Sequence, residues 1–139
     1  MKLVRLVLLG ALVLACTAPG GSSSPTPTLT PAGPPPTVTG IVTAGPVCPA
    51  ERNPPDPACA PRPVAGAVIV ATDTTGQSVG RATSAADGTY LLKVGETGTF
   101  VITALPVTGL MGVPASVTVT LAFSGATAHV DLVYDTGIR

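Results

Sequence analysis

Hydrophobic and polar residues alternate along short segments of the chain from residue 37 onwards. In residues 116–121, for example, valine and leucine occupy every second position, with serine or threonine between them. A period of two is typical of a β-strand that buries one face. We predict seven strands, separated by turn residues, at 37–43, 67–72, 78–83, 90–94, 99–105, 116–121 and 127–134. No segment has a helical period, so the pattern predicts an all-β fold, a single seven-stranded Greek-key β-sandwich.

The same alternation predicts which side chains face the core. Residues 67–72 form a continuous apolar run, which is typical of a central strand covered on both faces. The more polar residues 78–83 are expected at the edge of a sheet. Among the aromatic residues only Phe123 is left outside the core, and those expected to point inward are Tyr90, Phe100 and Tyr134.

Residues 86–88, with the sequence Ala-Asp-Gly, are predicted to form a hairpin turn. Asp and Gly suit such a turn because both tolerate a positive φ. We therefore assign structural roles to Asp87 and Gly88 in the turn, and to Tyr90 in the core behind it.

The first fifteen residues have the pattern of a secretory signal peptide, with Lys2 and Arg5 ahead of a short apolar run that ends at Ala15. The run is too short for a transmembrane helix, which needs roughly 20 apolar residues. The sequence Val13-Leu14-Ala15-Cys16 resembles the lipobox of bacterial lipoproteins. This resemblance implies that Cys16 becomes the lipidated first residue of the mature chain. The alternative is a plain secreted protein in which Cys16 is incidental.

A lipoprotein of this kind would be a cell-envelope protein, anchored by fatty acyl chains such as palmitate. It would sit on the outer, extracytoplasmic face of a bacterial membrane. That membrane would be the plasma membrane or, in a two-membraned bacterium, the outer membrane. Stable attachment takes more than one acyl chain, and lipoproteins carry several.

Residues 16–36 follow the signal and consist mainly of Pro, Ser, Thr and Gly. Such a composition cannot bury enough apolar surface to offset the entropy of ordering, so we predict a disordered linker. A Pro-rich ligand and an O-glycosylated stalk are the alternatives. The predicted organisation is therefore a signal peptide over 1–15, a lipid-attachment cysteine and linker over 16–36, and one domain over 37–139.

Several segments of that domain resemble the carboxypeptidase regulatory-like family. They are Thr39-Gly40-Ile41-Val42, residues 63–70, Asp87-Gly88-Thr89-Tyr90 and residues 98–102. The resemblance implies a transthyretin-like, or prealbumin-like, sandwich of seven strands. It also implies that the domain is not catalytic.

Residues 44–62 are the most individual part of the domain. Cys48 and Cys59 are the two cysteines left once Cys16 is lipidated, and in an oxidising compartment we expect them to form a disulfide. The prolines between them would make the loop stiff, which lowers the entropic cost of binding a partner. The polar residues of this candidate recognition loop are Glu51, Arg52, Asn53 and Asp56. The alternative is that the disulfide only secures a long insertion.

Charge and composition argue against several classes of function. Seven basic and seven acidic residues give a net charge of zero, so there is no basic field for nucleic acid. His129 is the only histidine and is expected on the outer face of the last strand, without a nucleophile at catalytic spacing. We therefore predict no catalytic residues, no metal site, no cofactor and no enzyme activity.

The order of the parts points to a lipid-anchored extracytoplasmic module with a structural, adhesive or protein-interaction role. Its expected partners are the membrane, through Cys16, and an envelope or extracellular protein or polysaccharide, and we expect a monomer. A carbohydrate-binding module is the alternative. A weaker alternative is an extracellular protease inhibitor that acts through the Cys48–Cys59 loop.

Overall fold

The computed structural model describes residues 33–50 and 52–139 of the chain. The predicted signal peptide, the predicted lipidation site Cys16 and most of the predicted linker lie outside the described residues, as does Glu51 of the candidate recognition loop. Within the described residues no helix is long or apolar enough to span a membrane.

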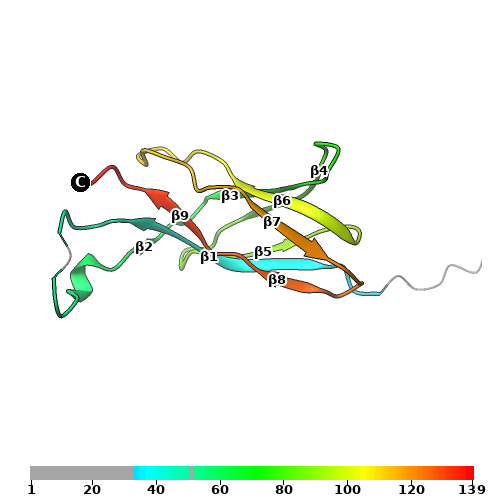
Figure 1. Cartoon of the computed structure of the whole chain (residues 1–139), viewed down its shortest axis with the longest axis horizontal. Coiled ribbons are helices and arrows are strands. Elements are labelled where there is room, and N and C mark those ends of the chain that lie inside the picture. Colours follow the sequence, from blue (N-terminus) through cyan, green and yellow to red (C-terminus); the bar gives the residue numbers. More distant parts are fainter. Residues whose placement is uncertain (1–32, 51) are drawn as a thin grey trace, which may run out of the picture. The chain divides into compact units, whose positions relative to one another are not determined.

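The described chain forms an all-β sandwich of two sheets, as the sequence predicts (Figure 1). One sheet is built around β1, which pairs with β2 and β5 on one side and with β8 and β9 on the other; the second has the order β4-β3-β6-β7. The strands are β1 (Thr37–Gly45), β2 (Arg62–Pro63), β3 (Val68–Thr72), β4 (Ser78–Thr83), β5 (Thr89–Lys93), β6 (Gly98–Ala104), β7 (Val117–Leu121), β8 (Thr127–His129) and β9 (Leu132–Asp135). A short 3-10 helix, η1 (Pro57–Cys59), precedes β2.

The predicted number of seven strands is wrong. The additional pairing strand β2 follows the long loop, where its two residues pair antiparallel with the end of β1. In addition, the segment 127–134 forms two strands rather than one, because Val130 and Asp131 leave the ladder. The first strand also extends to Gly45, two residues beyond the predicted end at Thr43.

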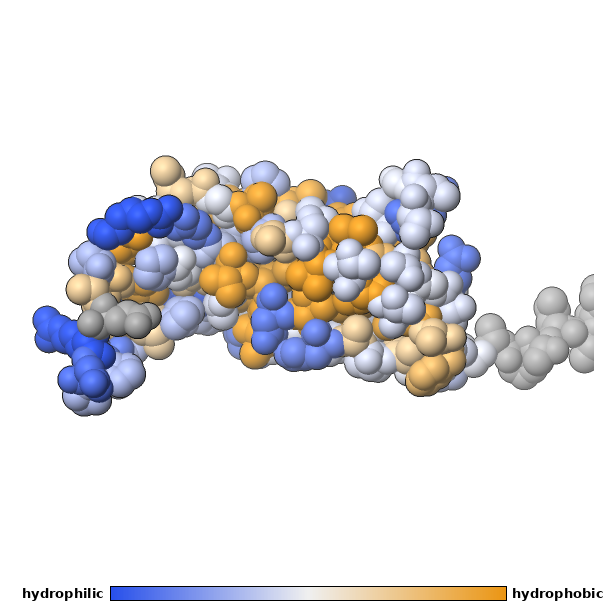
Figure 2. All heavy atoms as spheres, in the orientation of Figure 1, coloured by the Kyte–Doolittle hydropathy of each residue, from blue (hydrophilic) through white to orange (hydrophobic). Residues whose placement is uncertain are grey.

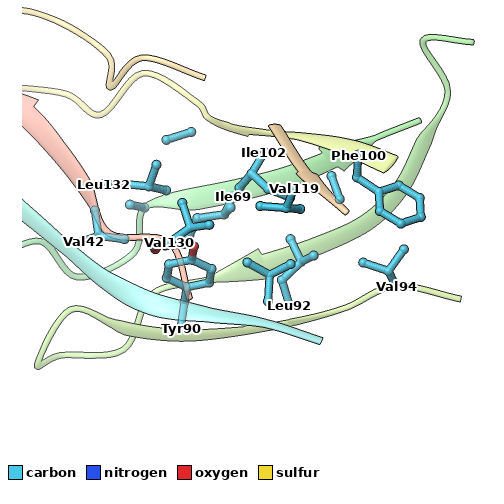
Figure 3. Close-up of a cluster of buried hydrophobic side chains, with 14 of the residues drawn as sticks. Val42, Ile69, Tyr90, Leu92, Val94, Phe100, Ile102, Val119, Val130 and Leu132 are labelled. Carbon is cyan, nitrogen blue, oxygen red and sulfur yellow. Dashed lines mark hydrogen bonds between the residues drawn. The ribbon is translucent and has the colours of Figure 1, made fainter. Parts of the chain in front are cut away.

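The core lies between the two sheets and is formed by the alternate residues of each strand. Figure 3 shows side chains of both sheets meeting there, among them Leu92, Phe100 and Ile102, which are at most 2% exposed. The inward assignment of Tyr90, Phe100 and Tyr134 is confirmed, since each is at most 5% exposed, and Phe123 is 67% exposed as expected. Burial of these side chains supplies the main driving force for folding.

The strand β3 occupies the central position expected for residues 67–72, with β4 on one side and β6 on the other. Its prediction as a strand covered on both faces is wrong, however. Ile69 and Ala71 are fully buried, but Val68 and Val70 on the opposite face are only half-buried. The outer face of this sheet is therefore partly open to solvent.

The predicted hairpin at residues 86–88 is also wrong. The turn is present, and Gly88 has a φ of 81°, but β4 and β5 belong to different sheets. The segment carries the chain from one sheet to the other. Behind it lies Ser84, a buried polar residue that the sequence did not indicate: its hydroxyl donates to Val64 O at 2.6 Å and accepts from Ala67 N at 2.9 Å.

A close approach between β1 and the break in the last strands fixes the sheet around β1. An ideal Cβ on Gly40 would lie 1.8 Å from the carbonyl oxygen of Val130, so only glycine fits there. The same oxygen accepts a 2.7 Å hydrogen bond from the buried hydroxyl of Tyr90. The Asp131 carboxylate accepts from Ile41 N at 2.9 Å, replacing a ladder bond. We call these four residues, Gly40, Tyr90, Val130 and Asp131, the Gly40 crossing.

Candidate recognition surface

The surface to which the sequence points lies at one end of the sandwich. It is made of the disulfide loop (residues 46–61), the 106–113 loop and the C-terminal residues 136–139, and we call it the loop end. The segment 33–36 that leads into β1 lies at the opposite end in Figure 1, and there Ser124 Oγ donates to Pro34 O at 2.9 Å. The nine residues of β1 connect the two ends, over roughly 30 Å at about 3.3 Å per residue.

The disulfide loop is secured at its base and across its middle. At the base, the antiparallel pairing of Thr43 with Pro63 and of Ala44 with Arg62 closes the loop. Above it, Cys48 and Cys59 form the expected disulfide, with their Cα atoms 5.3 Å apart. Closing a loop of eleven residues stabilises the fold by about 3 kcal/mol in the chain-entropy picture.

A turn of 3-10 helix shapes the second half of the loop. Asp56 caps it: its carboxylate accepts from Ala58 N at 2.9 Å, and its carbonyl accepts from Cys59 N at 2.9 Å. Pro57 begins the turn, where its missing N–H costs nothing. Asp56 is half-buried, and its hydrogen bonds hold the backbone of this turn. Arg52 and Asn53 are exposed.

A shallow hollow of about 440 Å³ lies within the loop. It is lined by both ends of the 52–61 segment, namely Arg52, Pro55, Asp56, Pro57, Cys59, Ala60 and Pro61. The lining is mostly apolar and stiff because three of its residues are proline, and the Arg52 guanidinium supplies a positive group at its margin. Such a hollow can hold one partner side chain or a short extended segment without reordering.

Two further hollows continue this surface beyond the disulfide loop. One, of about 410 Å³, is lined by Ala44, Val47, Arg62, Leu110, Thr136 and Ile138; the other, of about 310 Å³, is lined by the 106–113 loop. Met111 and Val113 beside them are 78% and 51% exposed. Sequence reasoning missed these apolar residues. The available signal for this apolar surface was methionine, which suits adaptable binding surfaces. The chain has two methionines, and one of them lies in a loop bounded by Gly and Pro.

The C-terminal residues are tied to the rest of the loop end. Met111 N donates to Asp135 O at 2.9 Å, and the Thr136 hydroxyl donates to Pro46 O. Arg139 forms a 2.7 Å ion pair with Asp135, and this hydrogen bond, helped by Gly137 N, lowers the pKa of Asp135 to about 2. Hydrophilic residues are prominent at this end of the molecule in Figure 2.

The other residues singled out from the sequence have structural places. The Asp87 carboxylate accepts from Thr89 N at 3.0 Å and from Thr89 Oγ1 at 2.7 Å, and these bonds lower its pKa. An added Cβ on Gly88 would lie 2.4 Å from Val42 O. Burial, with a contribution from the Asp131 charge, raises the pKa of Tyr90 to about 12.

His129 lies on the outer face, as expected, with its side chain 65% exposed and its Nε2 3.0 Å from the Asp131 carboxylate. Among residues 33–50 and 52–139, no group of three His, Cys, Asp or Glu residues is placed to hold a metal ion. Of the residues singled out from the sequence, those of the disulfide loop therefore lie together at the loop end. Asp87, Gly88 and Tyr90 instead belong to the turns and strands of the sandwich.

The sequence matches no protein-family model, and no curated protein matches it. The fold is similar to that of the minor pilin GBS52 of the Gram-positive pathogen Streptococcus agalactiae, with a TM-score of 0.53 and 12% identity over 75% of this chain and 45% of that one. The group B streptococcus pilus 2b backbone protein matches with a TM-score of 0.47 and 16% identity, over 72% of this chain and 41% of that one. The chain thus matches less than half the length of either pilus protein. The similarity to GBS52 shows the all-β fold.

Proposed function

We propose that the chain is an extracytoplasmic structural or adhesive module that presents its loop end to an envelope or extracellular protein or polysaccharide. The observation that carries this proposal is the placement of the disulfide loop. The loop lies at the end of β1 opposite residue 33, so a chain held at its N-terminus would direct it outward. A disulfide is the expected cross-link of an oxidising compartment. The pilin-like fold supports the same placement by analogy only.

The proposed anchor is lipid on Cys16, which rests on the lipobox resemblance. Mass spectrometry of the mature N-terminus tests it directly. We expect a chain that begins at Cys16 and carries acyl groups. A chain cleaved elsewhere, or an unmodified Cys16, would show that the protein is secreted without this anchor.

The recognition role is tested by comparing retained partners between variants of the full chain. Immobilised wild type and a variant with Arg52→Ala and Asn53→Ala are exposed to an envelope extract of the source cells. Both side chains are exposed, so the variant should fold normally. Arg81→Ala on β4 is the matched control, since it also removes one exposed positive charge but lies away from the loop end. We expect a partner that wild type and control retain and the loop variant loses. Identical retention by all three would exclude the loop as the contact.

The carbohydrate-binding alternative has one specific candidate, the exposed aromatic ring of Phe123. A glycan array that shows binding by wild type and loss in Phe123→Ala would favour it over the loop. The protease-inhibitor alternative would require the exposed Arg52 to occupy a protease pocket. Full activity of a trypsin-like protease in the presence of a molar excess of this protein would exclude the inhibitor alternative. We also propose that the module has no catalytic activity, as the sequence predicts.

A further inference from the structure

The strand β7 forms an unprotected edge of the second sheet. It pairs with β6 on one side only, through the register Gly98 with Leu121 to Ile102 with Val117. Among the described residues, no backbone hydrogen bond joins the opposite side of β7 to any other segment. An edge of this kind presents a row of unpaired N–H and C=O groups that can accept another strand.

The other edge of the same sheet, β4, carries the usual protection. It has an exposed Arg81 in its middle, it contains Gly80, and its pairing with β3 is interrupted by an irregularity at Ala71 and Thr72. Charged side chains and bulges are devices by which native proteins prevent edge-to-edge association. These devices are lacking in β7, because no Lys, Arg, Asp or Glu occurs anywhere between residues 97 and 130.

The composition of β7 also favours pairing. Its sequence is Val-Thr-Val-Thr-Leu, all residues of high β-propensity or apolar character, without proline or glycine. Thr118 and Thr120 are exposed on the outer face, while Val119 and Leu121 turn into the core.

We propose that β7 pairs antiparallel with β7 of a second copy of this chain, so that the two four-stranded sheets become continuous. The proposal goes beyond the display function and uses a different surface. A register centred on Val119 would place Thr118 of each copy opposite Thr120 of the other. This arrangement is two-fold symmetric and closes on itself, as most homodimer interfaces do.

A second copy suits this edge because the edge complements itself. No charged residue meets another across the two-fold axis, and each exposed position is a threonine facing a threonine. The sheet already contains such a pair, since Thr99 Oγ1 and Thr120 Oγ1 lie 3.1 Å apart across β6 and β7. Cross-strand threonine pairs stabilise antiparallel sheets, so the proposed pairing would extend the same row.

The pairing should be weak in dilute solution. A contact through one five-residue strand is smaller than the roughly 800 Å² per partner of a standard stable interface. Confining the copies to one surface raises their effective concentration and would favour the dimer without any new contact. The monomer expected from the sequence would then be the dilute form.

Sedimentation of the full chain in density-matched detergent, from about 1 μM to about 500 μM, tests the proposal. We expect a reversible monomer–dimer equilibrium for the wild type. In a Thr118→Lys/Thr120→Lys variant, positive charges would face each other across the axis and weaken the dimer at least about tenfold. The matched control Ser78→Lys/Thr83→Lys adds the same charge at exposed positions of β4 and should dimerise as the wild type does.

A charge-swap experiment completes the test. A Thr118→Glu/Thr120→Glu variant should also be monomeric by itself, and an equal mixture with the lysine variant should form a mixed dimer. Recovery in the mixture would also prove that both variants are folded; if a double variant does not fold, the single variants Thr118→Lys and Thr120→Glu, whose side chains face each other in the mixed dimer, replace it. A wild type that stays monomeric throughout, or a dimer that the lysine variant retains, would overturn the proposal.

Discussion

The Gly40 crossing and the disulfide loop hold their backbones in place by opposite means. At the crossing, a missing side chain allows two strands to approach. A buried hydrogen bond from Tyr90 to the Val130 carbonyl oxygen and an exposed one from Ile41 N to Asp131 fix the contact. In the loop, exposed chain is restrained by a covalent bond between Cys48 and Cys59 and by proline. The first solution needs the whole core around it, whereas the second is local. Substitutions at the crossing should therefore disturb the packing of the whole sandwich, and substitutions in the loop should leave its strands unchanged.

The largest effect is expected from Gly40→Ala. The new methyl group would meet the Val130 carbonyl oxygen at 1.8 Å, so one strand must move and the Tyr90 hydrogen bond is lost with it. We expect the free energy of unfolding to fall by at least about 3 kcal/mol, measured by urea denaturation. The control is Gly95→Ala, where nothing lies within 4 Å of the added Cβ, and which should change stability by less than about 0.5 kcal/mol. Equal effects of the two would contradict the steric account.

Removing the disulfide should have the next largest effect. The double variant Cys48→Ser/Cys59→Ser frees the eleven-residue loop and should lower the free energy of unfolding by about 3 kcal/mol. Because the sandwich does not depend on the loop, its far-UV circular dichroism at 25 °C should match the wild type. Two titratable thiols in the native wild type would show that the bond does not form. Loss of the native spectrum in the variant would show that the loop is part of the core.

A smaller loss is expected from Tyr90→Phe. The variant keeps the ring in the core but leaves the Val130 carbonyl oxygen without the 2.7 Å hydrogen bond of the hydroxyl. The cost should be about 1–2 kcal/mol in urea denaturation at neutral pH. Phe123→Leu, on an exposed ring of the same domain, is the control and should be near neutral.

The ionisation of the Tyr90 hydroxyl should also lower the free energy of unfolding at alkaline pH. Its pKa rises from 10.0 to about 12 on folding because the neutral form is favoured by burial and by the Asp131 charge. The resulting stabilisation is complete below pH 10 and is lost as the pH rises towards 12, because the phenol then ionises more readily in the unfolded chain. The difference in stability between wild type and Tyr90→Phe should therefore shrink over that range. A constant difference would contradict the assignment.

The smallest effect concerns Asp87 at the turn between the sheets. Hydrogen bonds from Thr89 lower its pKa, so its contribution is present above the ordinary carboxyl pKa and declines as the pH falls through the lowered value. Asp87→Asn keeps an acceptor oxygen but does not titrate. The variant should therefore lose slightly less stability on acidification than the wild type, measured as the shift of the urea midpoint. Identical acid profiles would mean that Asp87 does not contribute.

The sequence predicted the strands and their inward faces well, because alternation directly reflects which side chains are buried. The prediction failed where the same local sequence pattern is compatible with two different tertiary arrangements. The Asp87-Gly88 turn suits a hairpin as well as a connection between sheets, and only the partners of β5 decide between them. The alternation through residues 127–134 continues across Val130 and Asp131, although the approach of Gly40 divides the strand there.

Only one part of the candidate surface, the disulfide loop, could be predicted from the sequence. Cysteines and prolines marked the disulfide loop, since both restrict the chain locally. The contribution of Leu110, Met111 and Ile138 depends on two segments that meet the loop only in the folded chain. No spacing in the sequence encodes that meeting.

The central place of β1 has a consequence for how the protein forms. This strand is the first to be synthesised in the domain, yet its partners on one side are the last, and the bond from Ile41 to Asp131 joins positions 90 residues apart. Contacts so distant are slow to form, and they cannot form at all before the C-terminal strands have left the ribosome. A nascent chain with this topology cannot complete the sheet around β1 before β8 and β9 have been synthesised.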